Sequence, residues 1–459
     1  MPTHLYIIKR RENMTDYSKD FWHPMLHPNE AKQREPIHIV SGDGVYITDD
    51  KGQKLLDGVA GLWCVNVGHN RPEMKQAIMN QLDELEYFQL FDGISHPRAT
   101  ELAAKLVSLT KPEKMTKAFF TSGGSDSVET ALKLARQFHM INGEPERKKF
   151  ISLKNSYHGV HFGGASVGGL NVFRRNYEPL LGGVTQLDTP WLYRNPWNCE
   201  DPDELAKLCV EQLEREIQHQ MPDTIAAFIA EPILGAGGVI VPPETYWPLV
   251  REMCDKYGIL LIADEVVTGF GRSGCMFGSR GWGVAPDMMC LAKGLSSGYI
   301  PLGAVMINER MEKAWDDNAD FNGVIMTGLT YSGHPVACAA GIEALNIVEK
   351  EDLPGNAKVQ GAYLLNALQP MVEKFKSVGE VRGKGLMIAI DLVTDKETRE
   401  PIDPTSGFAN EIAAAARAAG VLIRPVGTKI ILSPPLIFQQ THCDQLVEAL
   451  NIAFTEVDK

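Results

Sequence analysis

Hydrophobic residues along this chain fall mostly into short continuous runs, separated by longer stretches in which apolar positions recur at helical spacing. Runs of strand length that are apolar on both faces, with helices between them, are typical of a mainly parallel sheet covered by helices. The pattern therefore predicts an α/β fold with a large sheet. The expected strands span residues 117–121, 149–153, 226–230, 259–264, 288–291 and 303–307. A helix is expected at about 126–140, after the first of these strands.

The two ends of the chain have different patterns. Residues up to about Pro36 are polar and punctuated by prolines, which favours an arm that packs on another surface, and alternation over 44–57 predicts a hairpin. After a long helix over about 335–349, we expect a strand at 387–391, a helix at 408–419, strands at 421–424 and 429–433, and a final helix. The predicted units are an N-terminal arm and hairpin (1–60) that belongs to the smaller domain, a large domain (61–334) and a smaller C-terminal α+β domain (335–459).

Composition narrows the class of protein. The formal charge of -13 and the lack of a basic stripe interleaved with aromatic residues argue against binding to nucleic acid. The longest strongly apolar run, 259–263, is far shorter than the roughly 20 residues that span a bilayer, so no membrane span is expected. Eight scattered cysteines without a C-x-x-C pair, and no apolar signal-peptide core after Arg11, favour a cytoplasmic protein with reduced thiols. Without H-E-x-x-H or a cysteine cluster, we expect no catalytic metal.

Lys293 is a candidate nucleophile. It stands between the apolar run at 288–291 and a glycine-containing turn, where partial burial lowers the pKa of an amine and allows it to attack a carbonyl. Asp264 ends the preceding apolar run and is placed to hold a protonated pyridine nitrogen. A lysine and an acid are the two protein groups that pyridoxal 5'-phosphate (PLP) chemistry needs most. Taken alone, Lys293 is better explained as a surface lysine, because most lysines are solvated.

Two further stretches suit a cofactor with a phosphate and a planar ring. Residues 121–126 join a strand to a helix, and a glycine-containing turn there offers free N–H groups and the positive end of the helix dipole. A tight turn with a capping residue explains this motif equally well in isolation. Tyr157 follows the strand at 149–153, where an aromatic side chain can stack on a ring. By itself, Tyr157 is more simply explained as a buried structural residue.

Glu231, Thr330 and Arg424 each have a functional and a structural explanation. Glu231, at a strand end before a flexible loop, is either a carboxylate near the cofactor edge or substrate amine, or part of a capped turn. Thr330 precedes a turn and a helix, which by itself indicates an N-terminal cap. Arg424 is flanked by apolar residues and needs an anionic partner, because an unpaired buried guanidinium is costly. That partner is either a ligand or an internal carboxylate.

The stretch 269–274 matches G-x-G-x-x-G and is the basis of a rival hypothesis, a nicotinamide-dependent oxidoreductase. The dinucleotide fingerprint must open a helix, whereas further glycines at 278, 281 and 283 interrupt the chain here. Asp264 and Glu265 also intervene between the strand and the glycines. The context therefore argues against a dinucleotide site.

Taken together and in this order, the motifs closely resemble the class III aminotransferases, specifically the amine (omega) aminotransferases that use pyruvate. The matching stretches cover nearly the whole chain and are residues 61–68, 157–159, 227–232, 235–243, 263–266, 269–272, 292–299, 330–335 and 422–424. The resemblance implies a fold-type I PLP enzyme with a seven-stranded type of sheet, assembled as a homodimer with both active sites at the subunit interface.

The resemblance also implies roles for individual residues. Lys293 is the expected Schiff-base lysine and Asp264 the partner of the pyridine nitrogen, while Trp63 lines the substrate pocket and Arg424 takes the carboxylate of the keto acid. Tyr157 stacks on one face of the ring and Val266 on the other. Thr330 reaches the phosphate from the neighbouring subunit. The full cofactor-binding set implied is Gly123, Gly124, Ser125, Tyr157, His158, Glu231, Asp264, Val266, Lys293 and Thr330.

Three departures from the family pattern concern cofactor and donor binding. Gly123 stands where a serine is common before the Gly-Ser of the phosphate loop, so one hydroxyl donor is missing. Leu234 replaces a frequent glutamine, and residues 88–95 differ from the aromatic, asparagine-containing pattern of close amine transaminases. The identity of the amine donor is therefore the least determined feature.

The expected reaction is a two-stage, ping-pong transfer of an amino group from a primary amine or omega-amino acid to pyruvate, which gives alanine. The donor remains open among aryl-alkyl amines, diamines such as putrescine, β-alanine and taurine. An aminomutase on the same fold, which needs no external keto acid, is the nearest alternative. A PLP-binding scaffold without activity is hard to reconcile with the presence of both Lys293 and Arg424.

Overall fold

The central feature of the computed structural model, which describes residues 20–32 and 36–459, is a seven-stranded sheet. Strand β10 is antiparallel to both of its neighbours and the remaining pairs are parallel, which confirms the predicted large, mainly parallel sheet. Strand β6 was not predicted because its sequence lacks a continuous apolar run and it lies partly exposed at the sheet edge. In spatial order the strands are β4 (Met115–Thr121), β10 (Gly303–Asn308), β9 (Met288–Leu291), β8 (Leu260–Asp264), β7 (Ile225–Ala230), β5 (Lys149–Leu153) and β6 (Val184–Leu187).

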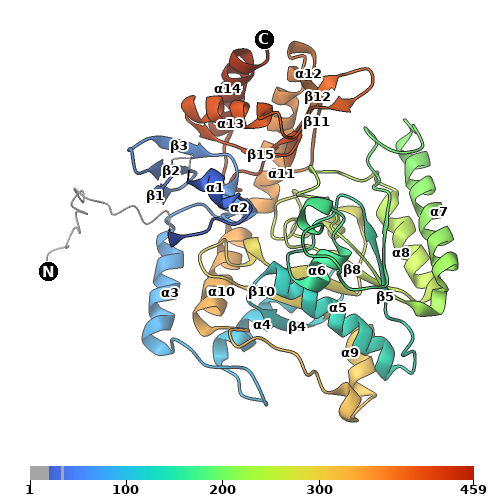
Figure 1. Cartoon of the computed structure of the whole chain (residues 1–459). Helices are drawn as coiled ribbons and strands as arrows, with labels where there is room; N and C mark the ends of the chain where they lie inside the picture. The colour runs from blue at the N-terminus through green and yellow to red at the C-terminus, as the bar shows by residue number, and fades with distance from the viewer. Residues whose placement is uncertain (1–19, 33–35) are drawn as a thin grey trace, which may run out of the picture.

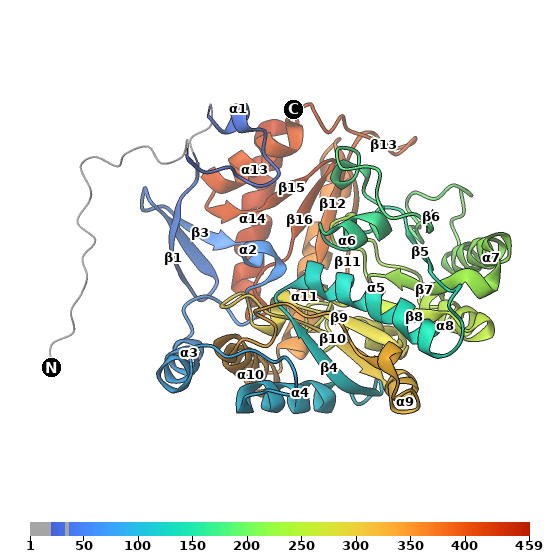
Figure 2. The same cartoon turned by 60° about the horizontal axis from the view of Figure 1, so that its bottom comes forward.

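Helices cover both faces of this sheet, which explains why its central strands are apolar throughout. Every residue of β7, β8 and β9 is buried. On β8, Leu260 and Ile262 belong to the core under helix α5 (Gly124–Ile141), whereas Leu261 belongs to the core on the opposite face with helix α8 (Tyr246–Tyr257). Figure 2 shows α5 running across the strands of this sheet. Burial of one such leucine side chain contributes about 1.5–3 kcal/mol.

Two smaller sheets lie beside the large one. The order of the first is β1-β2-β3-β14, and β14 is parallel to β3, so the predicted hairpin is confirmed and joined by a C-terminal strand. The order of the second is β11-β12-β16-β15, with β13 paired to β12. Their strands are β1 (Ile39–Asp43), β2 (Tyr46–Asp49), β3 (Lys54–Asp57), β11 (Val378–Gly383), β12 (Ile388–Asp395), β13 (Glu400–Pro401), β14 (Val421–Leu422), β15 (Arg424–Val426) and β16 (Lys429–Leu432).

The prediction of one strand at 421–424 is wrong. Val421 and Leu422 pair with β3, whereas Arg424 pairs with Ile431 of β16, and the chain passes from one sheet to the other at Ile423. Each half has its own hydrogen-bonding partner, which local sequence does not reveal.

The remaining α-helices connect and cover these sheets. Helix α10 packs against α3 and α4, and α14 packs against α11 and α13. Figure 1 shows the C-terminal helices at the top, the N-terminal strands beside them and the large sheet with its helices below. We propose the domain division predicted from the sequence, with α10 as the connecting helix. The α-helices other than α5 and α8 are α1 (Pro28–Ala31), α2 (Ala60–Trp63), α3 (Pro72–Glu84), α4 (Pro97–Leu109), α6 (Phe162–Val167), α7 (Pro202–Gln220), α9 (Glu309–Asp316), α10 (Pro335–Lys350), α11 (Leu353–Leu368), α12 (Met371–Lys374), α13 (Phe408–Ala418) and α14 (Gln440–Val457).

The predicted N-terminal arm lies largely outside the described residues. The structure describes residues 20–32 and Pro36 of this arm, and the short helix α1 within them has no buried residue. Across the described parts of the chain, no helix combines the length and apolar character needed to cross a membrane.

Candidate active site

A cavity of about 290 Å³ opens at the carboxyl ends of the central parallel strands. Ligands bind at this edge in open α/β sheets, because the loops that follow the strands converge there. All the predicted cofactor-binding residues except Thr330 line the cavity. Stretches up to about 170 residues apart in the chain, from Gly123 to Lys293, are thus brought to one place.

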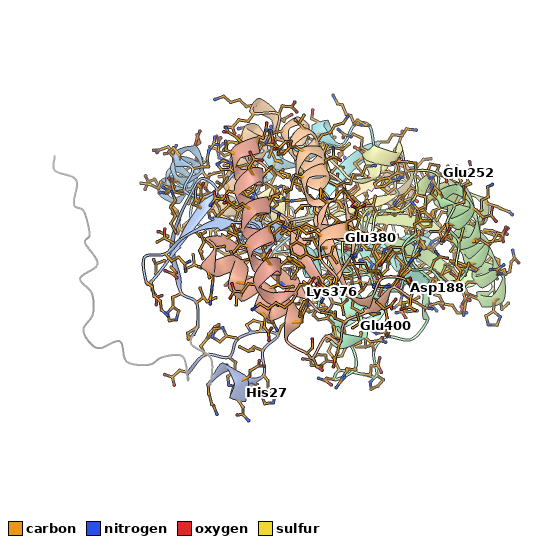
Figure 3. All side chains as sticks on the ribbon, turned by 90° about the horizontal axis from the view of Figure 1, so that it is seen from above. His27, Asp188, Glu252, Lys376, Glu380 and Glu400 are labelled. Atoms are coloured by element: carbon orange, nitrogen blue, oxygen red, sulfur yellow. The ribbon has the colours of Figure 1, made fainter. Side chains whose placement is uncertain are left out.

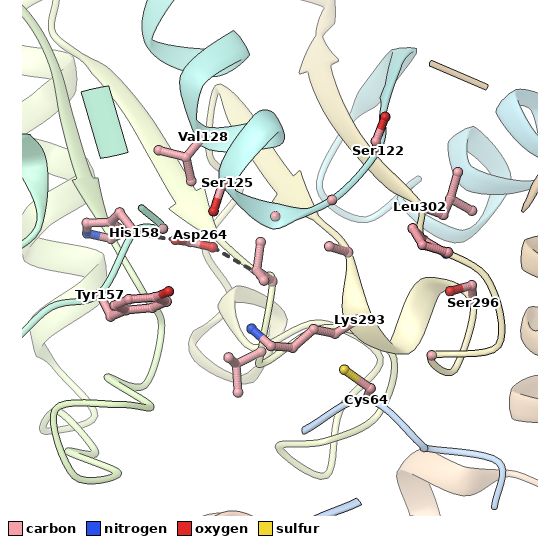
Figure 4. A pocket seen from close by; sticks show the side chains of 18 of the residues that line it. Cys64, Ser122, Ser125, Val128, Tyr157, His158, Asp264, Lys293, Ser296 and Leu302 are labelled. Carbon is pink, nitrogen blue, oxygen red and sulfur yellow. Dashed lines mark hydrogen bonds and ion pairs between the residues drawn. The ribbon is translucent and has the colours of Figure 1, made fainter. Parts of the chain in front are cut away.

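Lys293 follows β9 and begins a short 3-10 helix (Lys293–Leu295). Its φ of 46° lies in the left-handed region, which is uncommon for a residue with a side chain and is frequent at functional sites. In Figure 4 its amine points into the cavity, towards Tyr157 and Asp264, with Cys64 beside its aliphatic part. Burial lowers the pKa of Lys293, although Cys64 and Asp264 act in the opposite direction. A lowered pKa favours the neutral amine, which is the nucleophilic form.

Asp264, the last residue of β8, has a carboxylate that is fixed on both oxygens. Its Oδ1 accepts from the Val266 N–H at 3.1 Å, and its Oδ2 accepts from Nδ1 of His158 at 2.7 Å. Asp264 is 3% exposed and His158 is 1% exposed, so this pair is shielded from water. The arrangement fixes the Asp264 carboxylate at the wall of the cavity.

The turn before α5 forms the other end of the cavity. Helix α5 begins at Gly124, so its first N–H groups and the positive end of its dipole face the cavity. A Cβ on Gly124 would lie 2.7 Å from Val266 Cγ1, so glycine permits the helix to approach this wall. The Ser125 hydroxyl accepts from the Val160 N–H at 3.2 Å and keeps its own proton for donation. These groups fit a phosphate dianion.

A substitution at Gly123 tests whether the turn before α5 binds the phosphate. A Cβ at Gly123 meets nothing within 4 Å, and its φ of 175° is ordinary extended backbone, so Gly123→Ser is sterically allowed. We expect the added hydroxyl to tighten PLP binding about tenfold, since a hydrogen bond to a charged group contributes about 1.5 kcal/mol. Fluorescence titration of the apoprotein with PLP measures the change. Ser125→Ala, which removes a hydroxyl already present, is expected to weaken binding; equal affinities for all three proteins would contradict the assignment.

Glu231 anchors the wall that carries Tyr157. Its Oε1 accepts from the Tyr157 N–H at 2.9 Å and its Oε2 from the Gly235 N–H at 2.8 Å. Burial and the nearby Asp264 raise the pKa of Glu231 to about 7, and His158 acts in the opposite direction. The Tyr157 ring lines the cavity, as needed for stacking on a planar ligand.

Three predicted site residues lie outside the lining of this cavity. Trp63 is buried next to Cys64, and Cys64 rather than Trp63 lines the cavity. Thr330 is exposed, and its carbonyl oxygen accepts from the Tyr87 hydroxyl at 2.8 Å. Arg424 lies close enough to Tyr157 and Lys293 to influence the pKa values of both. These positions leave the predicted roles of Trp63, Thr330 and Arg424 as proposals.

Several lining residues were not identified from the sequence. Cys64 stands next to the predicted Trp63, and Ser296, Ile300, Pro301 and Leu302 follow Lys293 closely in the chain. Proximity to a motif was the available signal, because nothing in the sequence separates Cys64 and Ser296 from the other cysteines and serines, and the remaining three side chains are apolar.

The G-x-G-x-x-G stretch has a structural part in this fold. Residues 266–278 form turns without an α-helix, as the sequence context indicated. Arg272 is fully buried, and its Nη1 donates to the Leu386 carbonyl at 3.2 Å while its Nη2 donates to Asn66 Oδ1 at 2.8 Å. The stretch therefore joins the large sheet to the C-terminal region and is not a dinucleotide loop.

Comparison with known proteins identifies the family of this chain. The model of the family "Aminotransferase class-III" matches residues 28–454. The putrescine–pyruvate aminotransferase of Pseudomonas aeruginosa is 41% identical over 92% of this chain and 91% of its own length. The omega-aminotransferase of Caulobacter vibrioides is 39% identical over 95% and 98%. The PLP-bound crystal structure of an amine transaminase from an uncultivated Pseudomonas species has a TM-score of 0.94 and 59% identity, covering 95% of this chain and 98% of its own. This chain belongs to the class III aminotransferases and is a PLP-dependent enzyme of fold type I.

Proposed function

We propose that this aminotransferase moves the amino group of a primary amine or omega-amino acid to pyruvate in two half-reactions with ping-pong kinetics. PLP, when bound, accepts the electrons of the substrate C–H bond and carries the amino group between the half-reactions. The residues of the chain supply attack, proton transfer and orientation. A relative named for pyruvate and putrescine supports this choice of substrates.

The proposed chemical roles follow from the positions of the groups. The amine of Lys293, with its lowered pKa, would act as the nucleophile that attaches PLP and would move a proton at the substrate carbon. Asp264 would pair with the ring nitrogen of PLP, and His158 keeps the Asp264 carboxylate in place. Tyr157 and Val266 would hold the ring, and Gly124 and Ser125 would hold the phosphate.

The proposal that the amino acceptor is a keto acid rests on the environment of Arg424. Burial lowers the pKa of Arg424, and Tyr157 is the main group that acts against this effect. Among the described residues, no carboxylate forms an ion pair with Arg424. A partly buried guanidinium without an anionic partner is unfavourable, so an anion supplied by the substrate fits this position. The rest of the cavity near Lys293 includes apolar groups of Ile300, Pro301 and Leu302, which suits donors without a carboxylate on the reacting carbon.

We expect Arg424→Ala to raise the apparent KM for pyruvate about 10- to 100-fold, because loss of a charge-assisted hydrogen bond costs about 1.5–3 kcal/mol. The KM of a carboxylate-free amine should change much less. Steady-state kinetics with each substrate varied separately measure both values, and Arg424→Lys serves as the charge-matched control with partial loss. Equal effects on both substrates would show that Arg424 has a structural role.

Alanine formation from pyruvate with a panel of amines tests the proposed function. The panel contains aryl-alkyl amines in both configurations, putrescine, β-alanine and taurine, with preference for the (S)-amine expected. Amine turnover that needs no added keto acid would favour the aminomutase alternative and overturn the proposal.

A homodimer completes the proposal. Segment 321–331 carries exposed apolar side chains, including Phe321 and Met326, which are 78% and 79% exposed. Phe91 packs closely on this segment, because a Cβ at Gly328 would lie 2.9 Å from its Cε1. A surface of this kind suits a second copy of the chain, with Thr330 reaching the neighbouring phosphate. The free cysteines support a reducing, cytoplasmic location.

A further inference from the structure

Arg382 of β11 lies where the C-terminal sheet meets the loop that follows β7. Its Nε and Nη2 both donate to the carbonyl oxygen of Gly238, at 2.8 and 2.6 Å. Its Nη1 donates to Glu380, and its Nη2 also donates to Asp391 at 3.0 Å. Arg382 is 8% exposed, so these bonds form away from bulk water. One guanidinium thus links two carboxylates of its own sheet to one carbonyl of the large domain.

An aromatic ring fixes the plane of this guanidinium. Arg382 Cζ lies 4.5 Å from the centre of the Trp191 ring, and the Trp191 indole N–H donates to Oε2 of Glu380 at 3.2 Å. In the view of Figure 3, Glu380 is labelled between the C-terminal helices on one side and the helices and strands of the large domain on the other. A planar guanidinium packed on an aromatic ring points its N–H donors in fixed directions, which a lysine ammonium does not do.

The loop that Arg382 holds, residues 231–240, is tightly closed. An antiparallel bridge joins its two arms, and the Gly238 N–H donates to the carbonyl oxygen of Gly235 at 3.0 Å. Gly238 has a φ of 120°, and a Cβ there would lie 2.4 Å from Lys429 Cδ, so glycine is needed at this position. A displacement of the Gly238 carbonyl therefore moves Gly235 as well.

Gly235 in turn supplies one of the two N–H groups that hold the carboxyl of Glu231. The other comes from Tyr157, whose ring lines the cavity. Glu231 is 3% exposed, so loss of one donor leaves a buried oxygen without its partner and favours a new side-chain position. A continuous path of hydrogen bonds thus runs from β11 to the cavity wall.

We propose that Arg382 is a positioning residue for the active site: by holding the Gly238 carbonyl from the neighbouring sheet, it fixes the Gly235 turn, the carboxyl of Glu231 and the backbone of Tyr157. The inference rests on the proposed function for its consequences in catalysis. Its direct structural consequence, the rigidity of residues 235–240, is measurable in the protein without cofactor.

Arg382→Lys is the test, with Arg194→Lys as the matched control. Arg194 also stacks on Trp191, at 5.1 Å, and forms an ion pair with Asp391 at 2.8 Å, but makes no hydrogen bond to the 231–240 loop. In Arg382→Lys we expect amide hydrogen exchange across 235–240 to become at least about tenfold faster in the apoprotein. PLP should bind several-fold more weakly. Arg194→Lys should leave both quantities near the wild-type values.

The visible absorbance of the PLP-loaded protein gives a second readout that a general loss of stability does not move. The carboxyl of Glu231 acts on the pKa of Lys293 through its charge, so a change in the position or solvation of that carboxyl alters the protonation of the group at Lys293. The pH midpoint of the absorbance change should therefore differ from the wild-type value in Arg382→Lys by on the order of half a unit, and not in Arg194→Lys.

The outcomes separate this inference from the proposed function. If exchange, PLP affinity and spectral midpoint of Arg382→Lys match those of Arg194→Lys, the inference is wrong while pyruvate-dependent activity of the wild type can stand. If the wild type lacks that activity but Arg382→Lys still loosens residues 235–240, only the proposed function fails. Should Arg382→Lys not fold, Gly238→Ala displaces the same carbonyl and must produce the same loosening for the inference to hold.

Discussion

Lys293→Ala is expected to remove turnover by a factor on the order of 10⁴ or more. Proton transfer by a positioned group alone contributes up to about 10⁴, and this substitution also removes the nucleophile that attaches the cofactor. The visible absorbance of the PLP-loaded protein should disappear or change to that of free cofactor. Steady-state rates with pyruvate and the best amine, together with absorbance spectra, measure both effects. The fold should persist, because the side chain lies in the cavity rather than in the core.

Lys293→Arg provides the matched control for charge and length. An arginine cannot lose its proton near neutral pH, so it should be as inactive as alanine if the neutral amine is what matters. Retained turnover or an unchanged spectrum in Lys293→Ala would overturn the assignment of this lysine. Recovery of part of the rate by an added small primary amine would further support a missing amine as the cause.

Asp264→Asn is expected to lower kcat/KM about 10²–10³-fold, the effect of removing one preorganised electrostatic group from a site of this kind. The amide keeps the size of the side chain but loses the charge that holds a proton on the ring nitrogen. It also disturbs the hydrogen bond from His158, which now meets a neutral or reversed partner. Kinetics and the spectrum of the loaded protein measure the change.

Asp264→Glu and His158→Gln show whether the loss of activity in Asp264→Asn comes from the lost charge or from the disturbed hydrogen bond. The glutamate keeps the charge at a displaced position and should retain more activity than Asp264→Asn. His158→Gln keeps a donor near Oδ2 and should lower activity only modestly, since it acts through the aspartate. If Asp264→Asn were nearly as active as the wild type, the ring nitrogen would need another partner.

The large sheet was predictable because each of its buried strands has a recognisable pattern in its own stretch of sequence. Each buried strand, such as β7 and β8, is a continuous apolar run, and burial on both faces is what such a run requires. The edge strand β6 and the two-sheet path of 421–426 were not predictable in the same way. These strands are fixed by hydrogen bonds to strands elsewhere in the chain, so their own hydrophobic pattern does not indicate which sheet they join.

The chemical identity of the site was predictable to a similar extent. Asp264 ends strand β8, and Lys293 and Tyr157 follow strands β9 and β5. Parallel strands bring their carboxyl ends to one edge of the sheet, where all three residues line the cavity. The partners that orient these groups were not predictable, because the donors to Asp264 and Glu231 include backbone N–H groups. Any residue except proline supplies a backbone N–H, so these bonds leave no trace in the sequence.

The sequence by itself determined the class of chemistry, because its motifs, taken together and in order, resemble those of the class III aminotransferases. Only the tertiary structure decided how these groups are held. It placed His158 against Asp264 and brought Arg382 from a distant sheet to the loop that fixes Glu231. The physical reason is that chemical identity belongs to single residues, whereas orientation and pKa arise from neighbours that the fold brings together.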